Sequence, residues 1–209
     1  MKTNMKDITG FVEAGYDDIA NAYHEAKDPN HNIDLLVKFC SLYLANSRVL
    51  DIGCGAGVPV SKYLSSRGHS VIGIDISNKM LNLARKNVPS GRFIRMNMVS
   101  IDFEDNSFDA LVSSYAIFHV PRDLHALIYR SFFRVLKPNG KFLISIGFSD
   151  WEGVEDFYGI NMYWSHYAWD NSVSLLENSG LEVLHSETRE PPGDGRHVWI
   201  IGRNTKENT

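Results

Sequence analysis

The sequence predicts an α/β fold of three layers, in which a seven-stranded, mostly parallel sheet carries helices on both faces and the last strand is antiparallel. Two observations predict it. Short apolar segments of strand type alternate along the chain with stretches of helical periodicity, which is the pattern of parallel sheets. A turn rich in proline and glycine at residues 191 to 195 joins the last two strand-like segments as a hairpin, so the last strand should run against the others.

The composition is that of an ordinary globular domain. The chain has 209 residues, of which 44% are hydrophobic and 22% charged, and its formal charge is −4. We expect one domain over residues 1 to 209 and a small-molecule substrate in preference to nucleic acid or a membrane surface. No apolar stretch reaches about 18 residues and none follows the N-terminus, so we expect neither a membrane span nor a signal peptide, and a cytoplasmic protein. The oligomeric state stays open.

The first element is a helix within the N-terminal segment 1 to 30. Over residues 11 to 25, apolar side chains recur at helical spacing and include Tyr16 and Tyr23. This helix either docks on the core with its hydroxyl groups at the rim or acts as a lid. A second helix, about residues 31 to 45, leads into the first strand.

The central feature is a strand, a glycine turn and a helix start. The apolar run that contains Asp51 is followed by Gly53, Gly55 and Gly57, and the helix predicted over residues 58 to 64 has a proline in its first turn. Glycine permits positive φ and close approach of the backbone, and free N–H groups at a helix start face the turn. The stretch therefore predicts a nucleotide or cofactor cradle.

The ligand of this cradle follows from spacing and charge. An NAD fingerprint needs glycine where Val58 stands, and no lysine with serine or threonine closes a Walker loop. Asp51 would repel a pyrophosphate but favour a ligand that carries an ammonium and a sulfonium, as S-adenosylmethionine does. With Asp51 in place, the stretch resembles motif I of the Rossmann-like class I S-adenosylmethionine-dependent methyltransferases.

Two further strand ends supply cofactor contacts. The second strand, residues 71 to 75, ends at Asp75, which lies 22 residues beyond Gly53, near the distance at which an acid reaches a ribose. Ile76 follows it, and a helix over residues 78 to 87 begins after a serine cap. The third strand ends at Asn97 and Met98. In the family an aspartate commonly holds this position and accepts the adenine amino group, so the resemblance implies that role for the uncharged Asn97.

The fourth strand, residues 108 to 114, leads to the place where we expect the substrate to bind. It ends at Ser114 and Tyr115, at the carboxyl edge of the sheet, so we expect Ser114 at the cofactor and Tyr115 at the substrate. His119 is the first candidate for a general base, because histidine titrates near neutral pH, although it equally fits a wall of the pocket. A helix over residues 122 to 136, a turn and a fifth strand over 141 to 146 follow.

Two more segments strengthen the resemblance. Residues 105 to 112 are similar to the family's Asp-Asn-Ser-Phe-Asp stretch, and residues 134 to 140 to its Arg-Val-Leu-Lys-Pro-Gly-Gly stretch, with an asparagine replacing the first glycine. The motifs stand in the family's order across residues 49 to 146. The segment Gly15 to Tyr23 is also similar to the family segment that covers the cofactor, which makes Tyr16 and Tyr23 candidate lid contacts.

Residues 147 to 169 form an aromatic insert, with seven aromatic residues in the nineteen positions from 151 to 169. It is either a wall over the pocket, a satellite core or a dimer surface. We expect Trp164 at the substrate and His166 as a second catalytic candidate. His197 begins the seventh strand, residues 197 to 203, at the same edge of the sheet as a substrate contact. The three histidines could converge, but we assign no metal.

The sequence thus predicts an S-adenosylmethionine-dependent methyltransferase that moves a methyl group to a small, partly apolar or planar metabolite by in-line displacement. It lacks the Asn-Pro-Pro-Tyr and Pro-Cys motifs of nucleobase methyltransferases. An NAD-dependent reductase and a non-catalytic S-adenosylmethionine-binding module remain alternatives. The acceptor molecule, the acceptor atom and the use of a general base are not determined by the sequence.

Overall fold

A computed structural model describes residues 5–26, 28, 30, 32–190 and 195–207. Its main sheet has seven strands in the order β3-β2-β1-β4-β5-β9-β8, and β9 alone runs antiparallel, between β5 and β8. The predicted α/β fold class is confirmed, while residues 191–194 of the predicted hairpin turn lie outside the described residues. The strands are β1 (Arg48–Ile52), β2 (Ser70–Asp75), β3 (Arg92–Arg95), β4 (Phe108–Ser113), β5 (Leu136–Gly147), β8 (Leu181–Arg189) and β9 (His197–Asn204).

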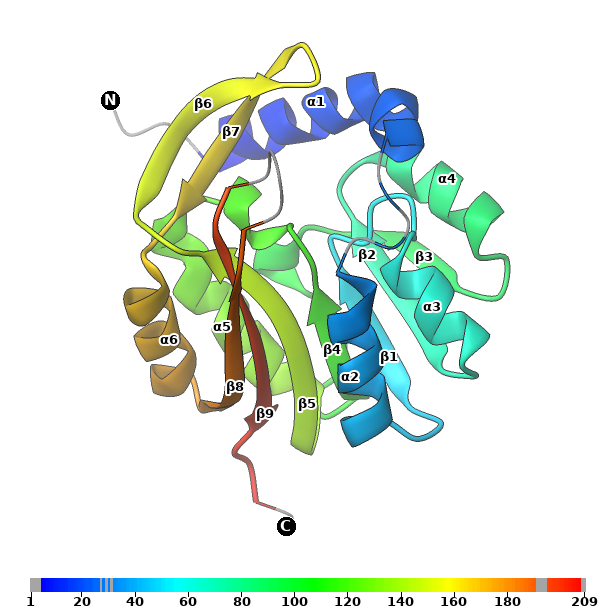
Figure 1. The fold of residues 1–209 in the computed structure, drawn as a ribbon, viewed down its shortest axis with the longest axis vertical. Coiled ribbons are helices and arrows are strands. Elements are labelled where there is room, and N and C mark those ends of the chain that lie inside the picture. Colours follow the sequence, from blue (N-terminus) through cyan, green and yellow to red (C-terminus); the bar gives the residue numbers. More distant parts are fainter. Residues whose placement is uncertain (1–4, 27, 29, 31, 191–194, 208–209) are drawn as a thin grey trace.

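Helices cover both faces of this sheet (Figure 1). Apolar side chains of α2 and α3 pack on one face together with Val49 and Val71, and α4 lies beside α3. The opposite face packs on α5 and α6. The helices are α1 (Met5–Ala26), α2 (Ile33–Tyr43), α3 (Val60–Ser66), α4 (Asn78–Asn87), α5 (His125–Val135) and α6 (Trp169–Asn178), with 3-10 turns η1 (Met98–Ser100), η2 (Ile117–His119) and η3 (Arg122–Leu124).

The central strands are apolar on both sides because both faces of the sheet are covered. In β1, Val49 packs with α2 and α3, whereas Leu50 and Ile52 pack with α5 and α6. Side chains alternate along a strand, so Asp51 points to the same face as Val49. The alternation therefore puts Asp51, the acid of the glycine motif, on the face that α2 and α3 cover.

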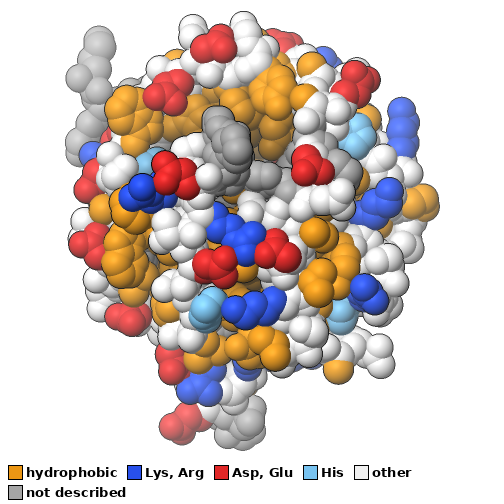
Figure 2. Space-filling view, in the orientation of Figure 1, with side chains coloured by type: hydrophobic (Ala, Val, Ile, Leu, Met, Phe, Trp, Pro, Cys, Tyr) orange, Lys and Arg blue, Asp and Glu red, His pale blue; other side chains and the backbone are white. Residues whose placement is uncertain are grey.

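The aromatic insert forms a second, two-stranded antiparallel sheet of β6 (Trp151–Phe157) and β7 (Ile160–His166). Tyr158 and Gly159 join the strands, and both have positive φ, 56° and 80°, as a two-residue hairpin turn requires. The hairpin stands above the main sheet beside α1 (Figure 1). Met162 and Tyr163 pack there with apolar residues of α1. Hydrophobic side chains gather over this upper part of the molecule (Figure 2).

Several boundaries differ from the sequence expectation. The first helix begins at Met5 rather than at residue 11, and α3 begins at Val60, so Pro59 precedes the helix. The fifth strand begins at Leu136 and includes the predicted turn of residues 137 to 140, with a register shift against β4. The register gives residues 137 to 140 no partners on β4, and Asn139 has a positive φ of 58°, so the predicted turn is present as an irregularity within the strand. Within the described part of the chain, no helix is long and apolar enough to cross a membrane.

Candidate active site

A cavity with about 890 Å³ of empty space, part of it open to solvent, lies at the carboxyl edge of the parallel strands. Loops after β1, β2, β3 and β4 supply its floor, and α1 covers it. This is the edge at which open α/β sheets hold ligands. Eleven of the predicted site residues line it, namely Tyr16, Tyr23, Gly53, Gly55, Asp75, Ile76, Asn97, Met98, Ser114, Tyr115 and His119.

The three glycines of the turn have different surroundings. All have positive φ, at 69°, 51° and 76° for Gly53, Gly55 and Gly57. A Cβ atom on Gly53 would lie 2.2 Å from the Cβ of Ala116, and one on Gly57 would meet α4 at 3.3 Å. A Cβ on Gly55 would meet nothing within 4 Å, and Gly55 lines the cavity whereas Gly57 does not. Gly53 and Gly57 therefore serve close packing, and Gly55 leaves its backbone open to the cavity.

Asp75 lies at the end of β2 with its carboxylate at the cavity wall. One oxygen accepts the backbone N–H of Gly55 and the other that of Ser77, each at 2.9 Å. Burial raises the pKa of Asp75, while the backbone hydrogen bonds oppose this shift. Each carboxylate oxygen has a second lone pair, so the group can still accept hydrogen bonds from two hydroxyl groups.

Asn97 lies at the end of β3 and caps the short turn η1. Its side-chain oxygen accepts the backbone N–H of Val99 at 2.9 Å, and its amide nitrogen donates to the hydroxyl of Thr9 at 3.4 Å. The oxygen keeps one lone pair, so an amino group in the cavity remains a possible donor to it. The contact with Thr9 also joins the strand end to α1.

Asp51 does not line the cavity. Its side chain is only 1% exposed and accepts the hydroxyl of Ser61, in α3, at 2.6 Å. The alternation of β1 directs it to the α2 and α3 face, beneath the turn rather than into the pocket. Its predicted contact with a cofactor stays a prediction.

Tyr16 and His119 both line the cavity and contact each other there. The Tyr16 hydroxyl lies 2.7 Å from Nε2 of His119, and Nδ1 of the same ring lies 2.9 Å from the carbonyl oxygen of Tyr163. A carbonyl oxygen only accepts, so Nδ1 carries the proton and Nε2 accepts the hydrogen bond of Tyr16. Burial lowers the pKa of His119 to about 4 and raises the pKa of Tyr16 well above its usual range. Both side chains are therefore uncharged at neutral pH.

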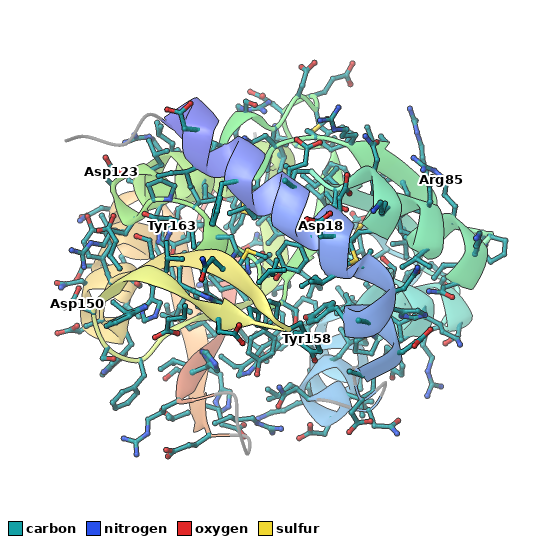
Figure 3. All side chains as sticks on the ribbon, turned by 90° about the horizontal axis from the view of Figure 1, so that it is seen from above. Asp18, Arg85, Asp123, Asp150, Tyr158 and Tyr163 are labelled. Atoms are coloured by element: carbon teal, nitrogen blue, oxygen red, sulfur yellow. The ribbon has the colours of Figure 1, made fainter. Side chains whose placement is uncertain are left out.

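Polar contacts fasten α1 over the cavity. Asp17 accepts the hydroxyl of Ser77 at 2.5 Å and the backbone N–H of Lys79 at 3.1 Å, at the start of α4. Glu13 forms an ion pair with Arg95 at the end of β3. Seen from above, α1 crosses the molecule alongside the hairpin (Figure 3). The helix thus bridges the ends of several sheet strands, as a lid would.

Comparison with known proteins relates the chain to methyltransferases. A family model described as a methyltransferase domain matches residues 50–144. The protein YqeM of Bacillus subtilis (strain 168) is 30% identical over 153 residues, which are 67% of this chain and 62% of that protein. Residues 50–144 therefore form a methyltransferase domain, and the chain is similar to S-adenosylmethionine-dependent methyltransferases. It spans less than two thirds of the length of the curated relatives it matches first, at 62%, 41% and 44%.

Solved structures of methyltransferases share the fold. An S-adenosylmethionine-dependent methyltransferase from Methanosarcina mazei is similar with a TM-score of 0.72 and 25% identity, covering 81% of this chain and 98% of that one. A Burkholderia thailandensis 1,6-didemethyltoxoflavin-N1-methyltransferase, with bound 1,6-didemethyltoxoflavin and S-adenosylhomocysteine, has a TM-score of 0.75 and 18% identity, covering 99% and 92%. The family's cofactor is S-adenosylmethionine, which decides against the NAD alternative.

Three predicted site residues lie beside the cavity rather than in its lining. The ring of Trp164 packs against that of His119 with centroids 4.3 Å apart and the planes tilted by 45°. Nδ1 of His166 lies 2.6 Å from the carbonyl oxygen of Ser149, and His197 packs edge-on against Tyr115 at 5.0 Å. Within the described residues no group of three or more His, Cys, Asp or Glu could hold a metal. The predicted roles of the three stay predictions.

The cavity also contains residues that the sequence analysis did not single out. Their common feature is a position next to a predicted one, on the glycine turn, at a strand end or on α1. Extending the helical spacing backwards from Val12 would have found Thr9 of α1, because the apolar stripe continues to Ile8. They are Thr9, Val12, His24, Cys54, Ala56, Val58, Ile74, Met80, Met96, Ala116 and Val120.

Proposed function

We propose that the protein binds S-adenosylmethionine in this cavity and transfers its methyl group to a small, partly apolar or planar metabolite by in-line displacement. The observation that carries this proposal is the Asp75 carboxylate, which backbone N–H groups of Gly55 and Ser77 hold at the cavity wall. A fixed carboxylate beside a glycine turn suits the two hydroxyl groups of a ribose. The proposal also rests on the similarity to methyltransferases. The chain spans only part of the length of these curated relatives, so the activity of the whole protein is part of the proposal.

We assign each part of the cofactor to a part of the lining. The ribose would lie at Asp75, and the adenine between Ile76 and the side chains of Asn97 and Met98. The methionine end would lie over the glycine turn, where α1 brings Tyr23 above it. The sulfonium group supplies an activated methyl group, so the protein mainly positions the two reactants and excludes water.

The acceptor would enter between α1 and the end of β4. Tyr16, Tyr115 and His119 line this part of the cavity. Their aromatic rings offer flat apolar surfaces, which supports a planar or partly apolar acceptor. The solved neighbour that binds 1,6-didemethyltoxoflavin provides independent support for a small molecule of this kind. Acidic and basic side chains are interspersed on the visible face, without a basic stripe (Figure 2).

Two measurements test the proposal. Calorimetry with S-adenosylmethionine, S-adenosylhomocysteine and NAD should give binding of both sulfur compounds and none of NAD. A metabolite extract incubated with methyl-labelled S-adenosylmethionine should then yield a metabolite that gains the labelled methyl group, detected by mass spectrometry. Binding without transfer in any extract would favour a non-catalytic binding module, and absence of binding would refute the proposal.

A further inference from the structure

A directed chain of hydrogen bonds ends at the Tyr16 oxygen. The Tyr163 carbonyl, in β7, accepts the Nδ1 proton of His119, and Nε2 of His119 accepts the Tyr16 proton. Because the single proton of the hydroxyl is committed to His119, the oxygen can offer only lone pairs to the cavity. Hydrogen bonds in such a chain polarise one another, so the Tyr16 oxygen becomes a stronger acceptor than an isolated phenol.

The charges around this oxygen favour a positive partner. Of the described residues that line the cavity, none is a lysine or an arginine, and the carboxylate among them is that of Asp75. The ionisable groups that act on Tyr16 are Tyr23, Asp75 and Tyr158, and none of them supplies a positive charge near neutral pH. Burial keeps His119 itself uncharged, with a pKa of about 4. An anionic acceptor would therefore find no lysine or arginine side chain among these residues.

We propose that the acceptor end of the cavity is built for an uncharged nucleophile whose reacting atom becomes positive during methyl transfer, with Tyr16 as a catalytic residue and His119 as the residue that positions it. The inference rests on the proposed function and deepens it. A hydrogen bond or ion–dipole contact to the Tyr16 oxygen strengthens as charge develops, so it stabilises the transition state more than the bound substrate. The rings of Tyr16, Tyr23 and Tyr115 add cation–π attraction.

The charge balance of the step is simple. An electron pair of an uncharged nitrogen or carbon forms the bond to the methyl carbon, and the pair of the broken carbon–sulfur bond stays on sulfur. The positive charge passes from sulfur to the acceptor. A methylated nitrogen keeps its proton until the product reaches water. A methylated carbon also keeps its proton until the product reaches water, so His119 stays uncharged throughout.

A matched pair of probes tests the charge preference without the natural substrate. Trimethylphenylammonium and tert-butylbenzene have nearly the same shape and differ by one positive charge. In the complex with S-adenosylhomocysteine, whose sulfur is neutral, we expect the cation to bind about 10-fold more tightly than the hydrocarbon. Tyr16→Phe should reduce this preference to about 3-fold or less, and Tyr43→Phe, in α2 outside the cavity, should leave it unchanged.

The positioning role of His119 has its own readout. In His119→Gln the side-chain oxygen can accept the Tyr16 hydroxyl and the amide can donate to Tyr163, so the cation preference should be retained. His119→Leu should lose it. Equal binding of both probes, or a preference that survives Tyr16→Phe, would overturn the inference. Failure of S-adenosylhomocysteine itself to bind would be a failure of the proposed function, and calorimetry with that compound alone distinguishes the two.

Discussion

At the scale of single residues, the glycines of the turn separate packing from binding. We expect Gly55→Ala and Gly57→Ala each to lower the unfolding free energy by about 1 to 2 kcal/mol, because alanine is strained at positive φ. Gly57→Ala should be the less stable, since its Cβ also meets α4. Only Gly55→Ala should weaken S-adenosylhomocysteine binding. Urea denaturation and calorimetry measure the two effects, with Gly10→Ala, which has ordinary φ and open space, as the control.

The Asp75 carboxylate gives a second prediction at this scale. Asp75→Asn should weaken S-adenosylmethionine binding by about 10- to 100-fold, because hydrogen bonds to a charged group contribute about 1.5 to 3 kcal/mol. Asp109→Asn is the matched control. Asp109 also accepts a backbone N–H, that of Arg48 at 2.7 Å, and the ammonium of Lys137 at 2.6 Å, but it lies outside the cavity. Equal losses in both variants would remove Asp75 from the proposed site.

The two acids show what the sequence can and cannot determine about a single side chain. Asp75 is the last residue of β2, so its carboxylate reaches the edge where the ligand cavity lies. Asp51 stands one residue before the end of β1, and alternation directs it beneath the turn, to Ser61. The order of the motif is visible in the sequence. The direction of each acid depends on where its strand ends, which local patterns define only to within a few residues.

At the scale of elements, α1 should open when its contact with α4 is removed. Asp17→Asn takes the charge from the group that accepts Ser77 and the N–H of Lys79. We expect faster hydrogen exchange over residues 5 to 26 and roughly 3- to 10-fold weaker S-adenosylmethionine binding, as charged hydrogen bonds are lost at one end of the lid. Asp18→Asn removes the neighbouring exposed charge (Figure 3) and should change neither quantity. Unchanged exchange in Asp17→Asn would show that the apolar contacts alone hold α1.

The hairpin is the element that the sequence did not predict. Strands buried on both faces, such as β1 and β4, appear as apolar runs, so the sequence predicts them. In β6, residues such as Glu152, Val154 and Glu155 give no alternation, since most of the strand is exposed. It is extended because it pairs along its whole length with β7, whose apolar residues pack on α1. The packing of β7 on α1, which lies far from it in the chain, therefore stabilises the hairpin. A local sequence pattern does not indicate this contact.

At the scale of the whole molecule, two buried histidines should couple stability to pH. Burial lowers the pKa of His119 and of His125 to about 4, whereas an unfolded chain has histidine values near 6.5. Between these values the unfolded state binds more protons than the native state, so the unfolding free energy falls as the pH falls from about 6.5 to about 4. At pH 5 each histidine should cost about 2 kcal/mol relative to pH 7.5. The raised pKa of Asp75 acts in the opposite direction and offsets part of this loss.

Urea denaturation at pH 7.5 and pH 5 measures this coupling. His125 lies against the Val120 carbonyl at 3.0 Å, outside the cavity lining, so His125→Gln can be compared without a change at the proposed site. We expect this variant to be less stable than the parent at pH 7.5 but to lose about 2 kcal/mol less on acidification, because one buried group that must stay uncharged is gone. The same substitution at the half-exposed His185 is the control. An identical pH dependence of parent and His125→Gln would show that His125 takes up its proton in the native fold without cost.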